Sequence, residues 1–76
     1  MTDHLPSAAQ VRAARALLAW SQEDLAKASG TSRRTLATLE GGGIVSSETM
    51  EAVRSALEAG GIVFTGNGGT EGLKRR

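Results

Sequence analysis

Apolar residues recur at helical spacing in four separate stretches of this 76-residue chain. Within each stretch they stand three or four positions apart, so one face of the corresponding helix would be buried. Polar residues fill the remaining faces, as in short helices that pack around one small core. The pattern therefore predicts a mainly α protein, a compact four-helix domain with helices over about residues 8–19, 22–29, 33–40 and 47–59.

Serine and glycine mark the boundaries of these predicted helices. A serine precedes each of them, and its hydroxyl can accept a hydrogen bond from a free N–H group of the first turn. The four serines are Ser7, Ser21, Ser32 and Ser46. Gly30 follows the second helix, where a left-handed backbone conformation is usual. Within that second helix, the spacing predicts that Leu25 and Ala28 face inward.

Three consecutive glycines, at positions 41–43, follow the third helix. Two interpretations of them stay open. They can simply end the helix, or the backbone N–H groups of Gly42 and Gly43 can approach a phosphate, because no side chain intervenes.

The last part of the chain, residues 60–76, has a different character. Ile62, Val63, Phe64 and Thr65 form a short β-branched and aromatic run, and a glycine-rich turn at 66–69 follows. The sequence therefore predicts a short C-terminal β-strand or hairpin. Because a lone hairpin is marginal in water, it must pack on the helices or pair with another chain. We expect residues 62–65 to form a dimerisation element.

The composition excludes several classes of function. The chain has no cysteine, and His4 is its only histidine, so disulfides, thiolate metal sites and histidine-based triads are not expected. No base is available to activate a serine or threonine, which argues against an enzyme, and no cofactor is expected. No apolar run reaches the ~20 residues of a membrane span, and no signal peptide is recognisable. We expect a cytoplasmic protein without a membrane partner.

Two arginines stand where helix stability does not favour them. Arg33 and Arg34 occupy the first turn of the third helix, where the macrodipole disfavours cations by about 0.3–1 kcal/mol. Together with Ala37 and Thr38 they point away from the apolar stripe. Arginines at the start of an outward-facing helix are suited to guanine edges in the DNA major groove. Two solvated surface arginines are the alternative, and with a net charge of only +1 any DNA affinity must be local.

The two short helices around Gly30 contain a recognisable set of residues. They are Ser21-Gln22-Glu23-Asp24-Leu25-Ala26, then Gly30-Thr31-Ser32, then Leu36, Leu39 and Glu40. In these residues the chain resembles the lambda-repressor-like (Cro-type, or xenobiotic-response-element) family of helix-turn-helix regulators, and the resemblance covers about residues 7–59. Two departures are visible: Thr31 stands where the family usually has an aliphatic residue, and a strand-like tail replaces the fifth helix of many members.

The family resemblance implies specific roles for several residues. Gln22 matches a glutamine that binds the DNA backbone and supports the third helix, and Arg15 and Glu40 match a pair that ties the first helix to the end of the third. Other matched positions contact bases or phosphates. With the outward alanine and the two loop glycines added, the remaining predicted DNA-binding residues are Ser32, Arg33, Arg34, Ala37, Thr38, Gly42 and Gly43.

These observations predict a division of labour along the chain. Residues 1–6 form a tail, residues 7–59 the DNA-binding domain with 33–40 as recognition helix, and residues 60–76 the dimerisation element. The predicted function is that of a bacterial, sequence-specific transcriptional repressor that binds double-stranded DNA as a homodimer. The alternative is an antitoxin-type or protein-interaction module whose C-terminal tail binds a protein partner.

Overall fold

The computed structural model describes residues 5–64 and 73–76. Within them it contains α1 (Ala8–Leu18), α2 (Gln22–Ser29), α3 (Arg33–Glu40), α4 (Ser47–Ala59), β1 (Ile62–Phe64) and β2 (Leu73–Arg75). The prediction of a mainly helical, four-helix fold with a short C-terminal hairpin is confirmed. Thr65 and the predicted turn at 66–69 lie outside the described residues.

Each helix begins directly after the capping serine that the sequence predicts for it. The hydroxyl of every cap accepts the N–H of the residue three positions on, at 3.0–3.1 Å. At α1 and α2 the bond is reciprocal, since Gln10 and Asp24 accept the N–H of Ser7 and Ser21 in return. These local bonds fix where the helices start before any tertiary packing is considered.

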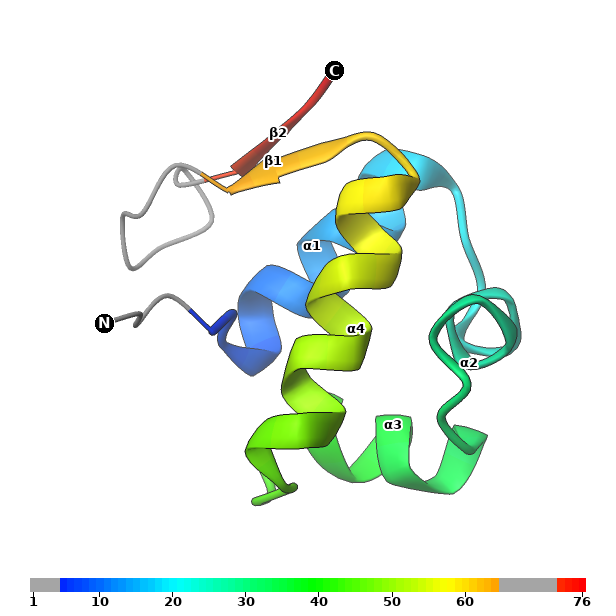
Figure 1. The fold of residues 1–76 in the computed structure, drawn as a ribbon, viewed down its shortest axis with the longest axis vertical. Helices are drawn as coiled ribbons and strands as arrows, with labels where there is room; N and C mark the ends of the chain where they lie inside the picture. The colour runs from blue at the N-terminus through cyan, green and yellow to red at the C-terminus, as the bar shows by residue number, and fades with distance from the viewer. Residues whose placement is uncertain (1–4, 65–72) are drawn as a thin grey trace.

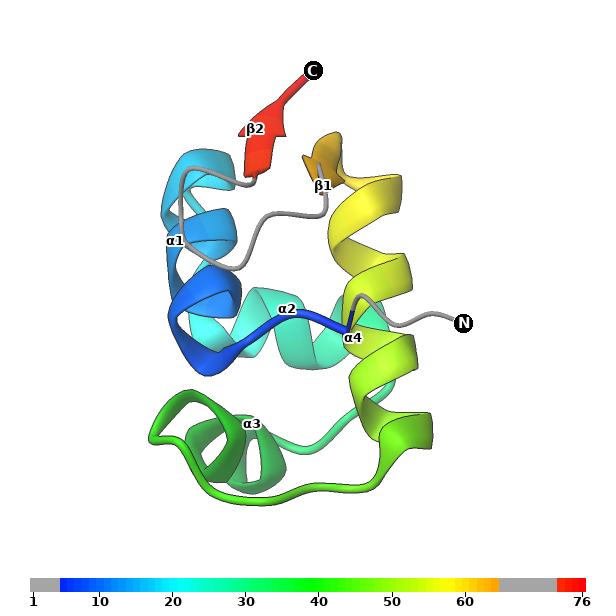
Figure 2. The same ribbon diagram turned by 90° about the vertical axis from the view of Figure 1, so that its left-hand side faces the viewer.

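The helices enclose one core and leave α3 at one end of the molecule. Figure 1 shows α4 running from the sheet at one end to the level of α3 at the other. Figure 2 shows α1 beside α4, with β2 over the end of α1 and β1 over the end of α4. The buried apolar residues are Val11, Ala14, Leu18, Leu25, Ala26, Leu36, Leu39, Val53, Ala56, Leu57, Ile62 and Leu73.

One sequence prediction about this core is wrong. Ala28 is exposed, and Ala26 is buried beside Leu25 instead. The reason is that α2 packs against both α3 and α4, so its buried face includes two consecutive positions. Helical spacing alone does not say how many neighbours a helix will have.

The two strands form an antiparallel hairpin that packs on the helices. Ile62 pairs with Arg75, Val63 with Lys74 and Phe64 with Leu73. Ile62 and Leu73 are buried against the core. The Arg75 guanidinium also donates to the carbonyl of Leu17, at 3.3 Å, in the last turn of α1. The end of the chain is therefore fastened to the helices by packing and by hydrogen bonds.

Trp20, in the connection between α1 and α2, packs its ring closely against Gly60. A Cβ atom on Gly60 would lie 2.8 Å from the Trp20 ring and 3.0 Å from Leu18, so only glycine allows the ring to approach this closely. Gly30, in the turn of the helix-turn-helix unit, has φ +71, and Ala19 has a left-handed φ of 57 without being glycine. Both residues follow a helix end, where this conformation is common.

Candidate nucleic-acid interface

Helix α3 is held by one face and presents the other. Leu36 and Leu39 are 0% and 3% exposed, and they anchor the helix in the core. The outer face consists of exposed residues at helical spacing, namely Arg33, Arg34, Ala37 and Thr38. Helix α3 lies at the end of the molecule away from the sheet (Figure 1), and the exposure of these four residues makes its outer face accessible.

The two arginines that open α3 are held only weakly by the rest of the protein. Arg33 Nη1 lies 4.0 Å from Glu23 Oε1, and both side chains are largely exposed. Arg34 has no ion-pair partner among residues 5–64 and 73–76. Exposed pairs of this kind contribute little to stability. Both guanidinium groups are therefore available to an anionic ligand.

The two hydroxyl residues predicted to bind DNA, the N-cap Ser32 and Thr38, already have hydrogen-bond partners in α3. Ser32 accepts the N–H of Thr35 at 3.0 Å and donates to the Thr35 hydroxyl at 2.9 Å. Thr38 donates to the carbonyl of Arg34 at 3.2 Å. Ser32 is thus occupied as a helix cap, whereas the Thr38 oxygen can still accept a hydrogen bond from outside.

Glu40 joins three helices at the C-terminal end of α3. Its carboxylate receives Arg15 Nε and Nη2, each at 2.8 Å, and Gln22 Nε2 at 3.1 Å. Arg15 also donates to the carbonyl of Trp20 at 2.9 Å. Gln22, matched by resemblance to a DNA-backbone ligand, therefore supports α3 directly through this network.

The hydrogen bonds and positive charges around Glu40 favour the ionised form of its buried carboxylate. Burial opposes ionisation of Glu40, yet the hydrogen bonds from Arg15 and Gln22 and the nearby charges of Arg15 and Arg12 outweigh it. The pKa of Glu40 consequently lies below its ordinary value. The pKa of Arg15 is raised in turn, mainly by its hydrogen bond to Glu40. The network is charged on both sides at neutral pH.

One contact at this end of α3 escaped the sequence analysis. Arg12 Nη1 donates to the backbone carbonyl of Glu40, from a position 28 residues earlier in the chain. No motif signals such a bond, because every residue has a carbonyl. The only hint in the sequence is that Arg12 stands one helical turn before Arg15.

The three glycines after α3 act as a helix stop. Their N–H groups, from Gly41, Gly42 and Gly43 in order, donate to the carbonyls of Ala37, Leu39 and Thr38 at 3.0, 3.0 and 2.8 Å. These donors are occupied, so the contact of Gly42 and Gly43 N–H groups with a phosphate has no free donor to use. The geometry favours the plainer of the two interpretations.

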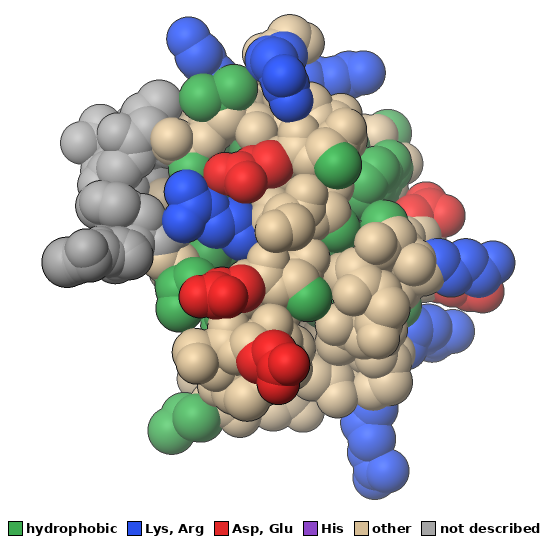
Figure 3. Space-filling model, in the orientation of Figure 1, with side chains coloured by type: hydrophobic (Ala, Val, Ile, Leu, Met, Phe, Trp, Pro, Cys, Tyr) green, Lys and Arg blue, Asp and Glu red, His purple; other side chains and the backbone are tan. Residues whose placement is uncertain are grey.

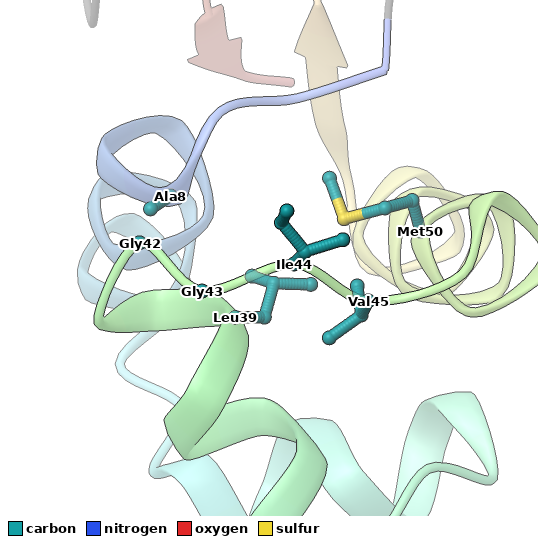
Figure 4. A pocket seen from close by; sticks show the side chains of 7 residues that line it. All are labelled: Ala8, Leu39, Gly42, Gly43, Ile44, Val45 and Met50. Carbon is teal, nitrogen blue, oxygen red and sulfur yellow. The ribbon is translucent and has the colours of Figure 1, made fainter.

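Beyond the glycines, the chain forms an open apolar pocket beside α3. Its volume is about 220 Å³, and Figure 4 shows the residues that line it, from the start of α1, the end of α3, the loop that follows α3 and the start of α4. They are Ala8, Leu39, Gly42, Gly43, Ile44, Val45 and Met50. Ile44 at its mouth is 96% exposed, so this side chain adds nothing to the core.

Acidic residues gather on a different part of the surface. Glu48 and Glu51 on α4 are exposed, and Glu58 pairs with Arg54 at 3.0 Å. Figure 3 shows acidic side chains along the middle of the face that α4 occupies in Figure 1. That face would repel a phosphate backbone. The outer face of α3 carries two arginines and no exposed carboxylate of its own.

Other kinds of site find no support in the described part of the chain. Residues 5–64 and 73–76 bring together no group of three His, Cys, Asp or Glu side chains that could hold a metal ion. No helix in those same ranges has the length and apolar character needed to cross a membrane.

Two short helices at an angle, with the second held from behind and exposed in front, define a helix-turn-helix DNA-binding domain. A protein-family model, the helix-turn-helix family HTH_3, matches residues 11–60 of the chain. The chain belongs to this lambda-repressor-like family, whose members are DNA-binding domains and not enzymes. Membership implies sequence-specific DNA binding and transcriptional regulation. No curated protein matches the chain significantly.

Proposed function

We propose that the protein represses transcription by binding double-stranded DNA as a homodimer, with α3 in the major groove of each half-site. The observation that carries this proposal is the pair Arg33 and Arg34, exposed and nearly unpartnered at the start of a helix that is otherwise anchored. Arginine can contact guanine O6 and N7 in bidentate fashion, which contributes about 1–3 kcal/mol of discrimination per pair. A protein that acts on DNA in this way works inside the cell.

Each exposed residue of α3 has a role in the proposed complex. Arg33 and Arg34 read base edges, and Ala37 allows close approach or contacts a thymine methyl group. Thr38 accepts a hydrogen bond from a base, or donates to a base or phosphate once its hydroxyl turns away from the Arg34 carbonyl. Gln22 keeps one amide hydrogen on Glu40 and offers its remaining polar atoms to the DNA backbone.

Homodimerisation is proposed because one short helix reads only a few base pairs. Two copies on half-sites about 34 Å apart supply useful specificity. Residues 62–65 are the proposed pairing segment. Lys74 and Arg75 place charges along β2, which disfavours pairing there, whereas β1 carries only Ile62, Val63 and Phe64. The sheet and α3 lie at opposite ends of the molecule (Figure 1), so a two-fold axis that runs from the sheet end towards the α3 end would leave both copies of α3 facing the same side.

Selection of random duplexes on the purified protein, followed by binding measurements, tests the reading role of α3. The half-site sequence and its spacing report specificity and symmetry together. Arg33→Ala and Arg34→Ala should each weaken binding to the selected sequence and relax the preference at individual positions. Lys74→Ala removes the same charge at the opposite end of the molecule and should leave the preference unchanged. If both arginine variants bind every duplex as the wild type does, α3 is not the reader.

Sedimentation tests the dimer separately. At high micromolar concentration, a complex with two 7.8 kDa chains per duplex is expected. A monomer under all conditions, on DNA as well as free, would refute the homodimer. Capture of a protein partner that depends on residues 60–76 would favour the antitoxin-type or interaction-module alternative.

A further inference from the structure

The last four carbonyl groups of a helix have no partner within the helix, and in α3 all four are satisfied. Those of Ala37, Thr38 and Leu39 accept N–H groups from the three glycines that follow. The fourth, on Glu40, accepts the guanidinium of Arg12. One orphan group of α3 is thus satisfied from a different helix, α1.

Arg12 and Arg15 together hold Glu40 at two points. Arg15 binds the carboxylate, and Arg12 binds the main-chain carbonyl of the same residue. The buried Leu36 and Leu39 already hold one face of α3, and two attachments from α1 at its C-terminal end further limit its tilt. Both cations also lie at the negative end of the α3 macrodipole, where they are favourable.

We infer that Arg12 is a positioning residue for DNA reading, which fixes the direction in which α3 presents Arg33 and Arg34 to the groove. This inference rests on the proposed role of α3 as the reading helix. A helix of eight residues is about 12 Å long, so a tilt of about 5° at Glu40 moves its far end by about 1 Å. Such a shift is large compared with the tolerance of a bidentate hydrogen bond.

The side chain of Arg12 is exposed, so two roles must be separated by experiment. An arginine that binds a phosphate contributes equally to all DNA sequences and steepens the salt dependence by about one unit of slope. A positioning arginine acts on the selected sequence alone. The ratio of specific to non-specific affinity, measured over a range of salt concentrations, tells the two roles apart.

The test compares Arg12→Gln with Arg75→Gln. Arg75 makes the same kind of bond, from a guanidinium to a carbonyl in the last turn of a helix, but on α1 at the opposite end of the molecule. Both variants lose one positive charge. We expect Arg12→Gln to lower the affinity for the selected duplex about tenfold, within the range of one base contact, with non-specific affinity and salt slope equal to those of Arg75→Gln. Arg75→Gln should keep the wild-type ratio.

A third variant, Arg12→Lys, keeps a donor and the charge and should recover most of the lost specificity. Thermal melting of each variant confirms that binding is compared between folded proteins. Equal loss of affinity for selected and random duplexes, with a shallower salt slope, would show a phosphate contact and overturn the inference. An unchanged ratio of specific to non-specific affinity would also overturn it.

A double Arg33→Ala, Arg34→Ala variant completes the set. If the double variant keeps full specificity, the reading role of α3 and this inference both fail. If the double variant loses specificity while Arg12→Gln keeps it, only this inference is refuted.

Discussion

Arg15 and Glu40 form a bidentate ion pair across the contact between α1 and α3, with Nε–Oε2 and Nη2–Oε1 both at 2.8 Å. Glu40 is 5% exposed, and Arg15 is its strongest charged partner. Removing the arginine would leave a carboxylate buried without its counter-ion. Arg15→Ala is therefore expected to lower the free energy of unfolding by about 3 kcal/mol. Urea denaturation measures this change.

A double-mutant cycle provides the control for that prediction. Because Glu40→Ala removes the buried charge, Arg15→Ala should cost much less in that background. Equal costs in the two backgrounds would show that Arg15 acts through packing alone.

The lowered pKa of Glu40 predicts an acid-sensitive contribution to stability. The folded protein holds the carboxylate in its charged form more strongly than the unfolded chain does. The contribution is therefore complete above the ordinary value of 4.5 and is lost as the pH falls through the lower folded value. Glu40→Gln removes it, so the stability gap between wild type and variant should be widest near neutral pH and narrow below pH 4.5.

Denaturation at a series of pH values checks this prediction. Asp24 needs to be followed in parallel, because its pKa is also lowered, first by the backbone N–H and then by the hydroxyl of Ser21. Asp24→Asn serves as the comparison. A gap between wild type and Glu40→Gln that stays constant from neutral pH to pH 3 would contradict the prediction.

The close approach of Trp20 to Gly60 predicts that replacing Gly60 will destabilise the protein. Gly60 has ordinary helical angles, so alanine there is not strained by the backbone itself. Its Cβ would instead meet the indole ring at 2.8 Å. Gly60→Ala should lower the melting temperature and cost about 1–3 kcal/mol of stability. In a Trp20→Leu background the same change should cost less, because only the contact with Leu18 at 3.0 Å is left, and an equal cost there would exclude the ring as the cause.

The left-handed conformation of Ala19 predicts the opposite result for a substitution to glycine. An L-residue with a side chain is disfavoured at φ 57, whereas glycine adopts that angle freely. Ala19→Gly is expected to stabilise the protein by about 0.5–1 kcal/mol in thermal or urea unfolding. Gly30→Ala, at φ +71, should destabilise it by a similar amount. A destabilised Ala19→Gly protein would contradict this account.

The exposure of Ile44 predicts that its side chain contributes nothing to folding stability. It is 96% exposed at the mouth of the pocket beside α3. Ile44→Ser should therefore leave the free energy of unfolding within about 0.5 kcal/mol of the wild type. Leu39→Ala, which empties a buried position lining the same pocket, should cost about 2–4 kcal/mol. A large loss in the Ile44 variant would mean that the side chain is covered in solution.

Local signals explain why the helix boundaries could be predicted from the sequence. Ser21 with Asp24 and Ser7 with Gln10 form their bonds within one turn, so the information lies within four residues. Gly30 likewise ends α2 through its own backbone angle. The outward position of Arg33 and Arg34 follows from the spacing of the leucines on the opposite face.

Contacts between distant elements could not be predicted in this way. The bond from Arg12 to the Glu40 carbonyl, and that from Arg75 to the Leu17 carbonyl, join main-chain atoms that carry no signature in the sequence. Burial of Ala26 in place of Ala28 depends on α2 having two neighbouring helices. These features require the tertiary arrangement, since they arise only when helices far apart in sequence meet.

The side chains that hold α3 and those that it presents belong to separate sets. Leu36, Leu39 and Glu40 are buried and fix the helix in place. The presented positions are all exposed: Arg33, Arg34, Ala37 and Thr38. Replacing a presented residue therefore leaves the frame untouched, so the preferred operator can change by single substitutions at little folding cost. A library randomised at these four codons would search for new target sequences on a scaffold that stays constant.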